Sequence, residues 1–395
     1  MANILDYMAW RGDVPFSVSP FNEVDGLVLS ELVYADFSGI VPEGDEGITV
    51  EEARKRFWGK HTPEEIMARD DYTKMAPFLM DQMADNGRYG GTVLRHFLNI
   101  VDPSADIQLA CMTFSLPDNT DFVAFRGTDS TIVGWKEDCL LSYLPETAGQ
   151  RRGVAYMNEH FTGSDRPLRV GGHSKGGNLA VYAAARCNPA IQDRILTVYN
   201  NDGPGFLEGF IQSEEYQKIL SRIVSVLPGS SLVGTLLEHT MQEHVVKSNA
   251  MGLIQHDGFS WQVLGNRFEE LDKRSDGSLL TEKVFHKWLG DQTESNRRVF
   301  VNTLFGLLES TGKSTLGQIR KDVVPSLNEM RKMLENMPKE DRDVTWNMIL
   351  QLLQTGTGSI VQEALQDAVQ DVMRNAGKEI MSRLESLGGK QAPNT

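Results

Sequence analysis

A serine surrounded by small residues is the part of this sequence best suited to covalent chemistry. Ser174 stands in the stretch Gly171–Gly177 (GGHSKGG), between the apolar run Leu168–Val170 and the alanine-rich run Asn178–Ala185. Strand, Gly-x-Ser-x-Gly and helix in this order are typical of a nucleophile elbow. The helix N-terminus behind the serine favours developing negative charge. A glycine-rich turn without chemistry fits the short motif equally, but both flanks favour the elbow.

Three further polar residues, like Ser174, come after runs that predict strands. Thr128 and Asp202 each follow an apolar run, and His256 lies beyond the final run. The runs that predict strands are 107–114, 122–125, 168–170, 195–199, 223–227 and 244–247. The loops that follow parallel strands meet at one edge of a sheet. We therefore expect Thr128, Ser174, Asp202 and His256 to gather at that edge.

The elements that must position these residues indicate an α/β fold with a mostly parallel sheet, because predicted strands alternate with helices. The two runs 107–114 and 122–125 flank a Pro-Asp-Asn-Thr turn and predict a hairpin. Helices are expected over about 23–37 and 148–160. Residues 41–105 are expected to form acidic loops and short helices, with helix starts at Thr49 and Thr62.

The pattern becomes helical and charged beyond about residue 265. The clearest helix is expected to begin near Ser359, where Gln362 completes a capping box. We therefore expect two parts, a catalytic domain over residues 1–290 and a helical extension over residues 291–395. The extension is expected to pack on the catalytic domain, to bind a partner or to mediate self-association.

Composition narrows the class of partner and the compartment. The chain has 395 residues and a net charge of −15, which argues against nucleic acid or an anionic membrane as the main partner. No apolar run approaches the ~20 residues of a membrane span, and the N-terminus lacks the pattern of a signal peptide. Three widely spaced cysteines suit a reducing compartment. A cytoplasmic location is expected.

The sequence implies neither a metal nor a cofactor. The eight histidines form no H-E-x-x-H motif, and the three cysteines form no C-x-x-C motif. The stretch 272–283 resembles a calcium loop, but Arg274 and Lys283 stand at ligand positions. The Gly-Lys-Ser sequence at 312–314 lacks the preceding strand of a nucleotide-binding loop.

Several motifs together resemble the class 3 lipase branch of the α/β-hydrolases, and more closely a bacterial family of lipase-like proteins. These motifs are Trp10-Arg11-Gly12-Asp13, Phe125-Arg126-Gly127-Thr128, Gly134-Trp135-Lys136-Glu137-Asp138, Gly172-His173-Ser174-Lys175-Gly176-Gly177, Asn201-Asp202-Gly203-Pro204-Gly205-Phe206 and Gln255-His256-Asp257. The resemblance covers roughly residues 1–290 and leaves out the helical tail. It implies an α/β-hydrolase fold.

The resemblance also implies roles for individual residues. Ser174 matches the nucleophile, and His256 takes the position of the general base. Thr128 matches the oxyanion residue, and the backbone N–H of Lys175 would be the second donor. The chain departs from class 3 lipases in having Lys175 where an apolar residue is usual. It also has only Ser230 and Ser231 where those lipases carry the catalytic acid.

Three carboxylates compete for the role of the acid. Asp202 follows the first predicted strand beyond the elbow, 28 residues after Ser174, an order that resembles pancreatic-type lipases. Asp257 adjoins His256, but a neighbouring side chain rarely reaches the imidazole beside it. Glu238 is expected within a helix. We favour Asp202, although its Asp-Gly-Pro-Gly setting also fits a carboxylate that only fixes a turn.

The segment 130–145 is expected to be a loop that covers the site and contributes pocket residues. The candidate pocket residues are Trp135, Leu140, Leu141 and Tyr143. A cation at Lys175 beside the oxyanion position favours short, polar or anionic acyl groups over long-chain lipid. Alternatively, Lys175 points away from the site and pairs with an acid such as Asp138.

These observations favour a serine hydrolase that cleaves an ester of a small or lipid-like substrate through a Ser-His-Asp triad and an acyl-enzyme. A thioesterase or an amidase would use the same residues. A different class remains open, in which a non-catalytic hydrolase scaffold uses its helical tail as an interaction module.

Overall fold

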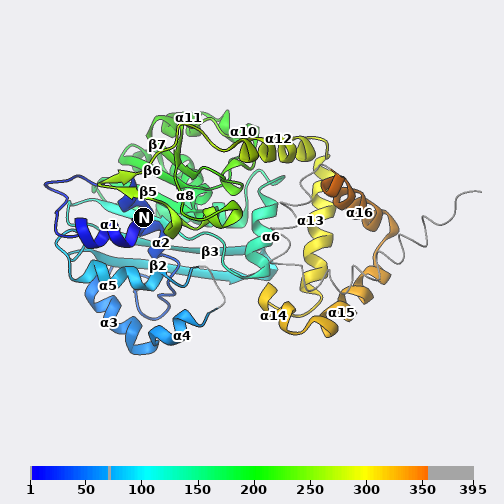
Figure 1. Cartoon of the computed structure of the whole chain (residues 1–395), viewed down its shortest axis with the longest axis horizontal. Coiled ribbons are helices and arrows are strands. Elements are labelled where there is room, and N and C mark those ends of the chain that lie inside the picture. Colours follow the sequence, from blue (N-terminus) through cyan, green and yellow to red (C-terminus); the bar gives the residue numbers. More distant parts are fainter. Residues whose placement is uncertain (1, 70–72, 355–395) are drawn as a thin grey trace, which may run out of the picture. The chain divides into compact units, whose positions relative to one another are not determined.

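An eight-stranded sheet with helices on both faces forms the larger of two units (Figure 1). The computed structural model describes residues 2–69 and 73–354. The pattern of contacts between residues divides the chain into two compact units. The first contains the described residues up to 129 and residues 133–290, and the second contains residues 130–132 and the described residues from 291. The helix expected from Ser359 lies outside the described residues.

The strands of the sheet lie side by side in the order of the sequence. They are β1 (Ile48–Thr49), β2 (Val93–Asp102), β3 (Ile107–Ser115), β4 (Asp121–Phe125), β5 (Leu168–His173), β6 (Ile195–Asn201), β7 (Ile223–Pro228) and β8 (Glu243–Val246). Neighbours from β1 to β4 are antiparallel, and neighbours from β4 to β8 are parallel. A small hairpin joins β9 (Val263–Leu264) and β10 (Arg267–Phe268).

Helices occupy much of the remaining described chain. In the α/β unit they are α1 (Ile4–Arg11), α2 (Glu23–Leu32), α3 (Val50–Lys60), α4 (Pro63–Met67), α5 (Leu79–Ala84), α6 (Ile132–Leu140), α7 (Ala148–Phe161), α8 (Lys175–Arg186), α9 (Pro189–Gln192), α10 (Glu208–Ile211), α11 (Glu214–Ile219) and α12 (Asp276–Gly290), with the first residue of α6 counted in the second unit. The second unit contains α13 (Glu294–Glu309), α14 (Leu316–Lys321), α15 (Val323–Asn336) and α16 (Lys339–Gln354). None of the helices described here is long and apolar enough to cross a membrane.

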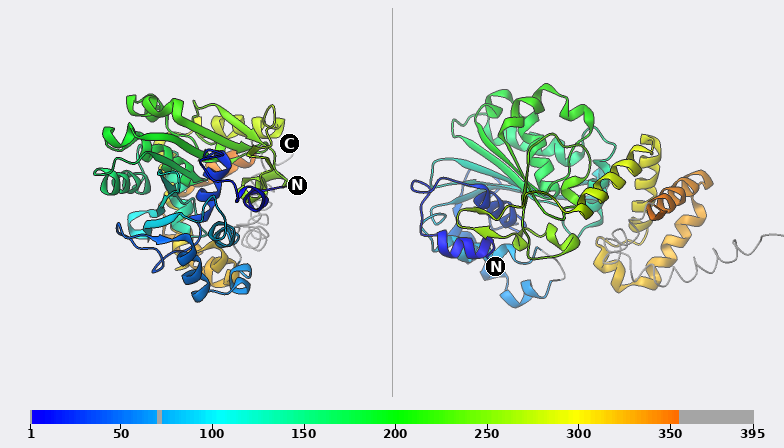
Figure 2. Two further views of the ribbon diagram at one scale, coloured as in Figure 1. Left: turned by 90° about the vertical axis from the view of Figure 1, so that its left-hand side faces the viewer. Right: turned by 45° about the horizontal axis from the view of Figure 1, so that its top comes forward.

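Alternating side chains of the central strands build two cores, one on each face of the sheet. Phe122 and Ala124 of β4 pack with α1, α2, α3 and α5, whereas Val123 and Phe125 pack with α7, α8 and α11. Figure 2 shows the blue N-terminal helices and the green central helices on opposite sides of the strands. Because both faces are covered, β4 is buried along its whole length, which explains its unbroken apolar run.

The α/β class with a large, mostly parallel sheet is confirmed, as are the hairpin of β3 and β4 and the helix starts at Thr49 and Thr62. The following three expectations were wrong. Residues 93–102 form β2 instead of loops and short helices, because a bulge between Arg95 and Leu98 interrupts the alternation that reveals a strand. The expected loop 130–145 contains α6, and the helix expected to reach residue 37 ends at Leu32.

Candidate active site

Ser174 occupies a strained turn between β5 and α8. Its φ of 58° and ψ of −136° lie outside the regions that side-chain-bearing residues usually adopt. Two glycines make the turn possible. A Cβ at Gly172 would lie 2.2 Å from the carbonyl carbon of Gly176, and a Cβ at Gly176 would lie 2.1 Å from the carbonyl oxygen of Phe125. The packing of β5, α8 and β4 therefore requires glycine on both sides of the serine.

The side chain of Ser174 is free for chemistry. Its hydroxyl does not cap α8, although the residue stands at the N-cap position, and the side chain is partly exposed. The end of β4 reaches the same place. A Cβ at Gly127 would lie 3.0 Å from the Cβ of Ser174 and 2.6 Å from the carbonyl oxygen of His173. Glycine at 127 thus allows the loop that carries Thr128 to approach the elbow.

Asp202 and His256 meet although 54 residues separate them in sequence. Nδ1 of His256 lies 2.7 Å from Oδ2 of Asp202. The carboxylate is buried, with 1% of the residue exposed, whereas 22% of the imidazole side chain is exposed. Because a carboxylate accepts the bond, Nδ1 donates, and Nε2 of a neutral ring is left as a base.

The second oxygen of Asp202 is held by donors from the segment after β7. Oδ1 accepts hydrogen bonds from Oγ of Ser231 at 2.5 Å and from the backbone N–H of Gly234 at 3.1 Å. The turn after β6 is fixed by a different residue, because Oδ1 of Asn200 accepts the N–H of Gly203. These contacts disfavour the interpretation in which Asp202 only stabilises its own turn.

The backbone of His256 is fixed by His173, the residue before Ser174. Nε2 of His173 donates to the carbonyl oxygen of His256 at 2.7 Å, so its Nδ1 accepts the hydroxyl of Tyr34 at 3.1 Å. Burial holds the pKa of His173 well below its usual value, so the ring is neutral. Trp261 adds a bond from Nε1 to the carbonyl oxygen of Gln255 at 2.9 Å. Together these contacts orient the imidazole of His256.

The two competing carboxylates have other partners. Oδ1 of Asp257 accepts the N–H of Phe259 at 3.0 Å and caps the short 3₁₀ helix Gly258–Ser260. Glu238 is exposed and lies 3.6 Å from Nδ1 of His286. It also forms a backbone bridge with Phe206 instead of standing in the expected helix. Of the three candidates, Asp202 alone bonds the imidazole of His256 in the part of the chain that the structure describes.

Thr128 lies against a partly buried carboxylate, that of Asp138. Its Oγ1 donates to Oδ2 of Asp138 at 2.6 Å. Burial raises the pKa of Asp138 from 3.8 to about 6, although the ammonium of Lys175 opposes the shift. The bond orients Thr128 beside Ser174. The backbone N–H of Lys175 is the first of α8, and such groups have no acceptor within their helix.

The side chain of Lys175 does not reach the site as a free cation. It is buried, and Nζ donates to Oε2 of Glu137 at 3.0 Å and to both oxygens of Gln108. Glu137 is fully buried and also accepts the N–H of Gly149. The alternative in which Lys175 pairs with an acid therefore applies, with Glu137 instead of Asp138 as the partner. The expected preference for anionic acyl groups loses its basis.

The four candidate pocket residues lie in different environments. Leu140, Leu141 and Tyr143 are each 5% exposed, whereas Trp135 on α6 is 42% exposed. Leu141 lines a small cavity beside α8, together with Leu144, Tyr182, Phe206 and Phe210, among others. Neither Ser174 nor His256 lines this cavity. Of the four residues only Leu141 lines this cavity, and their role as a substrate pocket remains a prediction.

Comparison with known proteins gives one relationship. A family model described as Mbeg1-like matches residues 83–306, which is more than half of the chain. The match includes Ser174, Asp202 and His256 and extends into α13. No curated protein matches the chain.

Proposed function

From the premise that the chain belongs to the Mbeg1-like family, which is lipase-like, we propose that it is a serine hydrolase with an α/β-hydrolase fold. Its substrate is an ester or a related acyl compound. Ser174 is the nucleophile, His256 the general base and Asp202 the acid that fixes the imidazole. The backbone N–H of Lys175 and that of Thr128, whose hydroxyl donates to Asp138, hold the oxyanion.

The proposed reaction proceeds in two acyl-transfer steps. Oγ of Ser174 attacks the substrate carbonyl carbon while Nε2 of His256 takes the hydroxyl proton. Negative charge develops on the carbonyl oxygen, beside the N-terminus of α8 and Thr128. The tetrahedral intermediate collapses, and His256 returns its proton to the departing alkoxide. Water, activated by the same imidazole, then hydrolyses the acyl-enzyme and restores the free serine.

The observation that carries this proposal is the bond between Asp202 and His256, at the edge of the sheet where β5 presents Ser174 in a strained turn. The carboxylate is buried and held by two further donors, so its position is fixed before substrate arrives. Strained backbone at a serine persists only where the surrounding structure enforces it. A catalytic role gives a reason for that strain.

A non-catalytic scaffold is the second candidate. The observation in its favour is that Oγ of Ser174 makes no hydrogen bond to His256 within the part of the chain described here. Catalytic hydrogen bonds are often long in ligand-free enzymes and tighten only when substrate binds. A scaffold would keep the fold and leave the serine unreactive.

A fluorophosphonate probe separates the two candidates, because it forms a stable adduct only with an activated serine. We expect the wild-type protein to be labelled at Ser174, as located by peptide mass mapping, and the Ser174→Ala variant to stay unlabelled. The variant should remain folded, because the hydroxyl does not cap α8. Unlabelled wild-type protein would support the scaffold.

The acyl group and the bond cleaved are separate questions. A panel of p-nitrophenyl esters of increasing chain length, with matched thioesters and anilides, tests ester, thioester and amide cleavage together. Ester cleavage lost in Ser174→Ala would support the proposal. The cytoplasmic location remains an expectation, for which the three unpaired cysteines are the support.

A further inference from the structure

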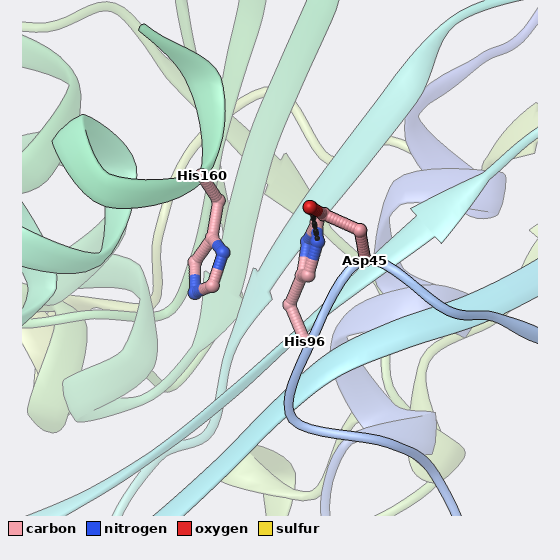
Figure 3. A group of neighbouring side chains, drawn as sticks. All are labelled: Asp45, His96 and His160. Atoms are coloured by element: carbon pink, nitrogen blue, oxygen red, sulfur yellow. Dashed lines mark hydrogen bonds and ion pairs between the residues drawn. The ribbon is translucent and has the colours of Figure 1, made fainter. Parts of the chain in front are cut away.

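Asp45, His96 and His160 come together from three segments that are far apart in the sequence (Figure 3). Asp45 lies on the exposed loop before β1, His96 on β2 and His160 near the end of α7. One ligand atom from each side chain lies within 4.8 Å of the others. Among the described residues, this is the only group of three acidic, histidine or cysteine side chains with such spacing.

His96 is held in the orientation that a metal ligand needs. Its residue is 2% exposed, its φ is 57°, and its Nε2 lies 2.9 Å from Oδ1 of Asp45. Its Nδ1 lies 3.2 Å from Oγ1 of Thr113, which is 2.9 Å from the hydroxyl of Tyr156. That hydroxyl donates to the carbonyl oxygen of His96.

This chain of bonds also accommodates the other tautomer of His96. With Nδ1 protonated, the ring donates to Thr113, Thr113 donates to Tyr156, and Tyr156 keeps its bond to the carbonyl oxygen of His96. Nε2 then points at Asp45 with a free lone pair. Metal-bound histidines usually donate their second ring nitrogen to an oxygen in this way.

His160 supplies a second imidazole, which packs against the rings of His96 and Tyr156. Its ring stacks on that of His96, with centroids 4.0 Å apart and planes 17° from parallel. The residue is partly exposed, and its ring nitrogens form no hydrogen bond to another residue that the structure describes. A metal lies in the plane of each imidazole that binds it, so the ring of His160 has to turn out of the stack on binding.

We propose that Asp45, His96 and His160 form a binding site for a divalent transition-metal ion of the zinc type. Two imidazoles and one carboxylate suit zinc, and a fourth position remains for water. Ligand atoms of one tetrahedral zinc lie about 3.3 Å apart. Since the three ligand atoms lie within 4.8 Å of one another, the pair that is furthest apart has to approach by roughly 1.5 Å at most. Rotation of His160 and movement of the exposed Asp45 supply this closure. Magnesium and calcium prefer all-oxygen sites and should not bind here.

Such an ion would join the loop before β1, the bulge of β2 and the end of α7. These segments are already linked by the bond between Asp45 and His96, by the N–H of Phe97 donating to the carbonyl oxygen of Pro42, and by the hydroxyl of Tyr156 donating to the carbonyl oxygen of His96. Motif search misses the site, because Asp45 and His160 lie 51 and 64 residues from His96. The site is separate from Ser174, so its occupancy tests neither the nucleophile nor the triad.

The test uses the full chain without an affinity tag, stripped with a chelator and titrated with zinc chloride in a calorimeter. We expect one ion per chain and a rise in the thermal midpoint that magnesium does not produce. Asp45→Asn and His160→Gln should each weaken zinc binding at least about tenfold. Both side chains are partly or fully exposed, so both variants should fold. His96 is left intact because its burial would confuse loss of binding with loss of folding.

Two substitutions serve as matched controls. Glu46→Gln removes the exposed carboxylate beside Asp45, and His244→Gln removes a partly exposed histidine on β8. Both should bind zinc as the wild type does. The proposal is overturned if the wild type binds no zinc in stoichiometric amount. It is also overturned if Asp45→Asn and His160→Gln bind zinc as tightly as the wild type. That result would place the ion elsewhere, for example on Cys139.

Discussion

The orientation of Asp202 depends on a serine that stands where class 3 lipases carry their catalytic acid. Oγ of Ser231 and the N–H of Gly234 occupy Oδ1 of Asp202, so Oδ2 is the oxygen that faces His256. In the proposed triad, Asp202 supplies the carboxylate from the end of β6, and Ser231 after β7 supports it with a hydrogen bond.

Ser231→Ala should therefore lower kcat/KM about tenfold, because a hydrogen bond to a charged acceptor contributes about 1.5–3 kcal/mol and the Gly234 donor remains. Ser230→Ala is the matched control. Its hydroxyl pairs with that of Ser275, so the rate should not change. Equal rates for both variants would show that Ser231 does not position the acid.

Asp138 makes the stability of the folded protein depend on pH, because burial raises the pKa of its carboxyl group. Its pKa of about 6 exceeds the unfolded value of 3.8, so the folded state binds more protons between these values. The carboxyl therefore makes the protein less stable as pH rises through this window. Asp138→Asn, which is neutral, should unfold with a free energy up to about 3 kcal/mol higher than the wild type at pH 7.

This difference should disappear below about pH 4, where Asp138 is protonated in both states. Urea unfolding of the two proteins from pH 4 to pH 7 measures it. A variant that is less stable than the wild type at pH 7 would show that attraction to Lys175 outweighs burial.

For individual residues, the sequence indicated which side chains could gather at the edge of the sheet, but it did not predict several of their contacts. The sequence placed Ser174, Asp202 and His256 on loops after strands, and the structure brings Asp202 and His256 into contact. The roles of all three remain predictions. The partner of Lys175 was not predictable, because Glu137 lies 38 residues away on a segment expected to be a loop.

The turn between β5 and α8 depends on a close approach between the backbones of α8 and β4. Gly176 lies so close to Phe125 of β4 that even a methyl group would overlap a backbone oxygen. β4 cannot retreat from α8 without breaking its pairing with β5. The glycine is therefore required by packing.

Gly176→Ala should lower the free energy of unfolding by about 3 kcal/mol or more, or prevent folding, because a rigid backbone atom must shift. Gly59→Ala is the control on α3, where no atom lies within 4 Å of the new Cβ. It should stabilise the protein by about 0.5–1 kcal/mol. Thermal or urea unfolding compares them, and a stable Gly176→Ala protein would contradict the packing argument.

The ion pair of Lys175 and Glu137 ties α8 to α6 across the interior. Lys175→Met leaves the buried carboxylate without its cation and should cost about 3–5 kcal/mol of unfolding free energy. The control is Lys55→Met, which removes an exposed pair with Glu51 and should leave the free energy of unfolding nearly unchanged. Similar losses in urea unfolding of the two variants would show that the buried pair has no special role.

Helices and strands with a regular pattern of apolar residues were predictable, whereas a strand whose pattern is interrupted was not. The parallel strands β5 to β8 and the helix α7 lie close to where apolar runs and turn residues place them. β2 was missed because its bulge turns His96 into a left-handed conformation and shifts the alternation. The same bulge presents His96 to Asp45 and His160, so the feature that hid the strand also forms the candidate metal site.

At the scale of the whole molecule, the family match and the two units do not have the same limits. The Mbeg1-like match ends at residue 306, within α13, whereas the second unit also takes in residues 130–132. In that unit the N–H of Ile132 donates to the carbonyl oxygen of Ser314, and Thr131 bridges Thr315. The role of the C-terminal helices as an interaction module remains a prediction.

The most direct test of the triad is the rate at which a fluorophosphonate labels Ser174. Labelling needs the activated serine and no knowledge of the substrate. Asp202→Asn should slow labelling by about 10³–10⁴-fold, because the imidazole loses the acceptor that fixes its tautomer. Asp257→Asn and Glu238→Gln should label at nearly the wild-type rate. Wild-type rates for Asp202→Asn, with a collapse in either control, would contradict the assignment of Asp202.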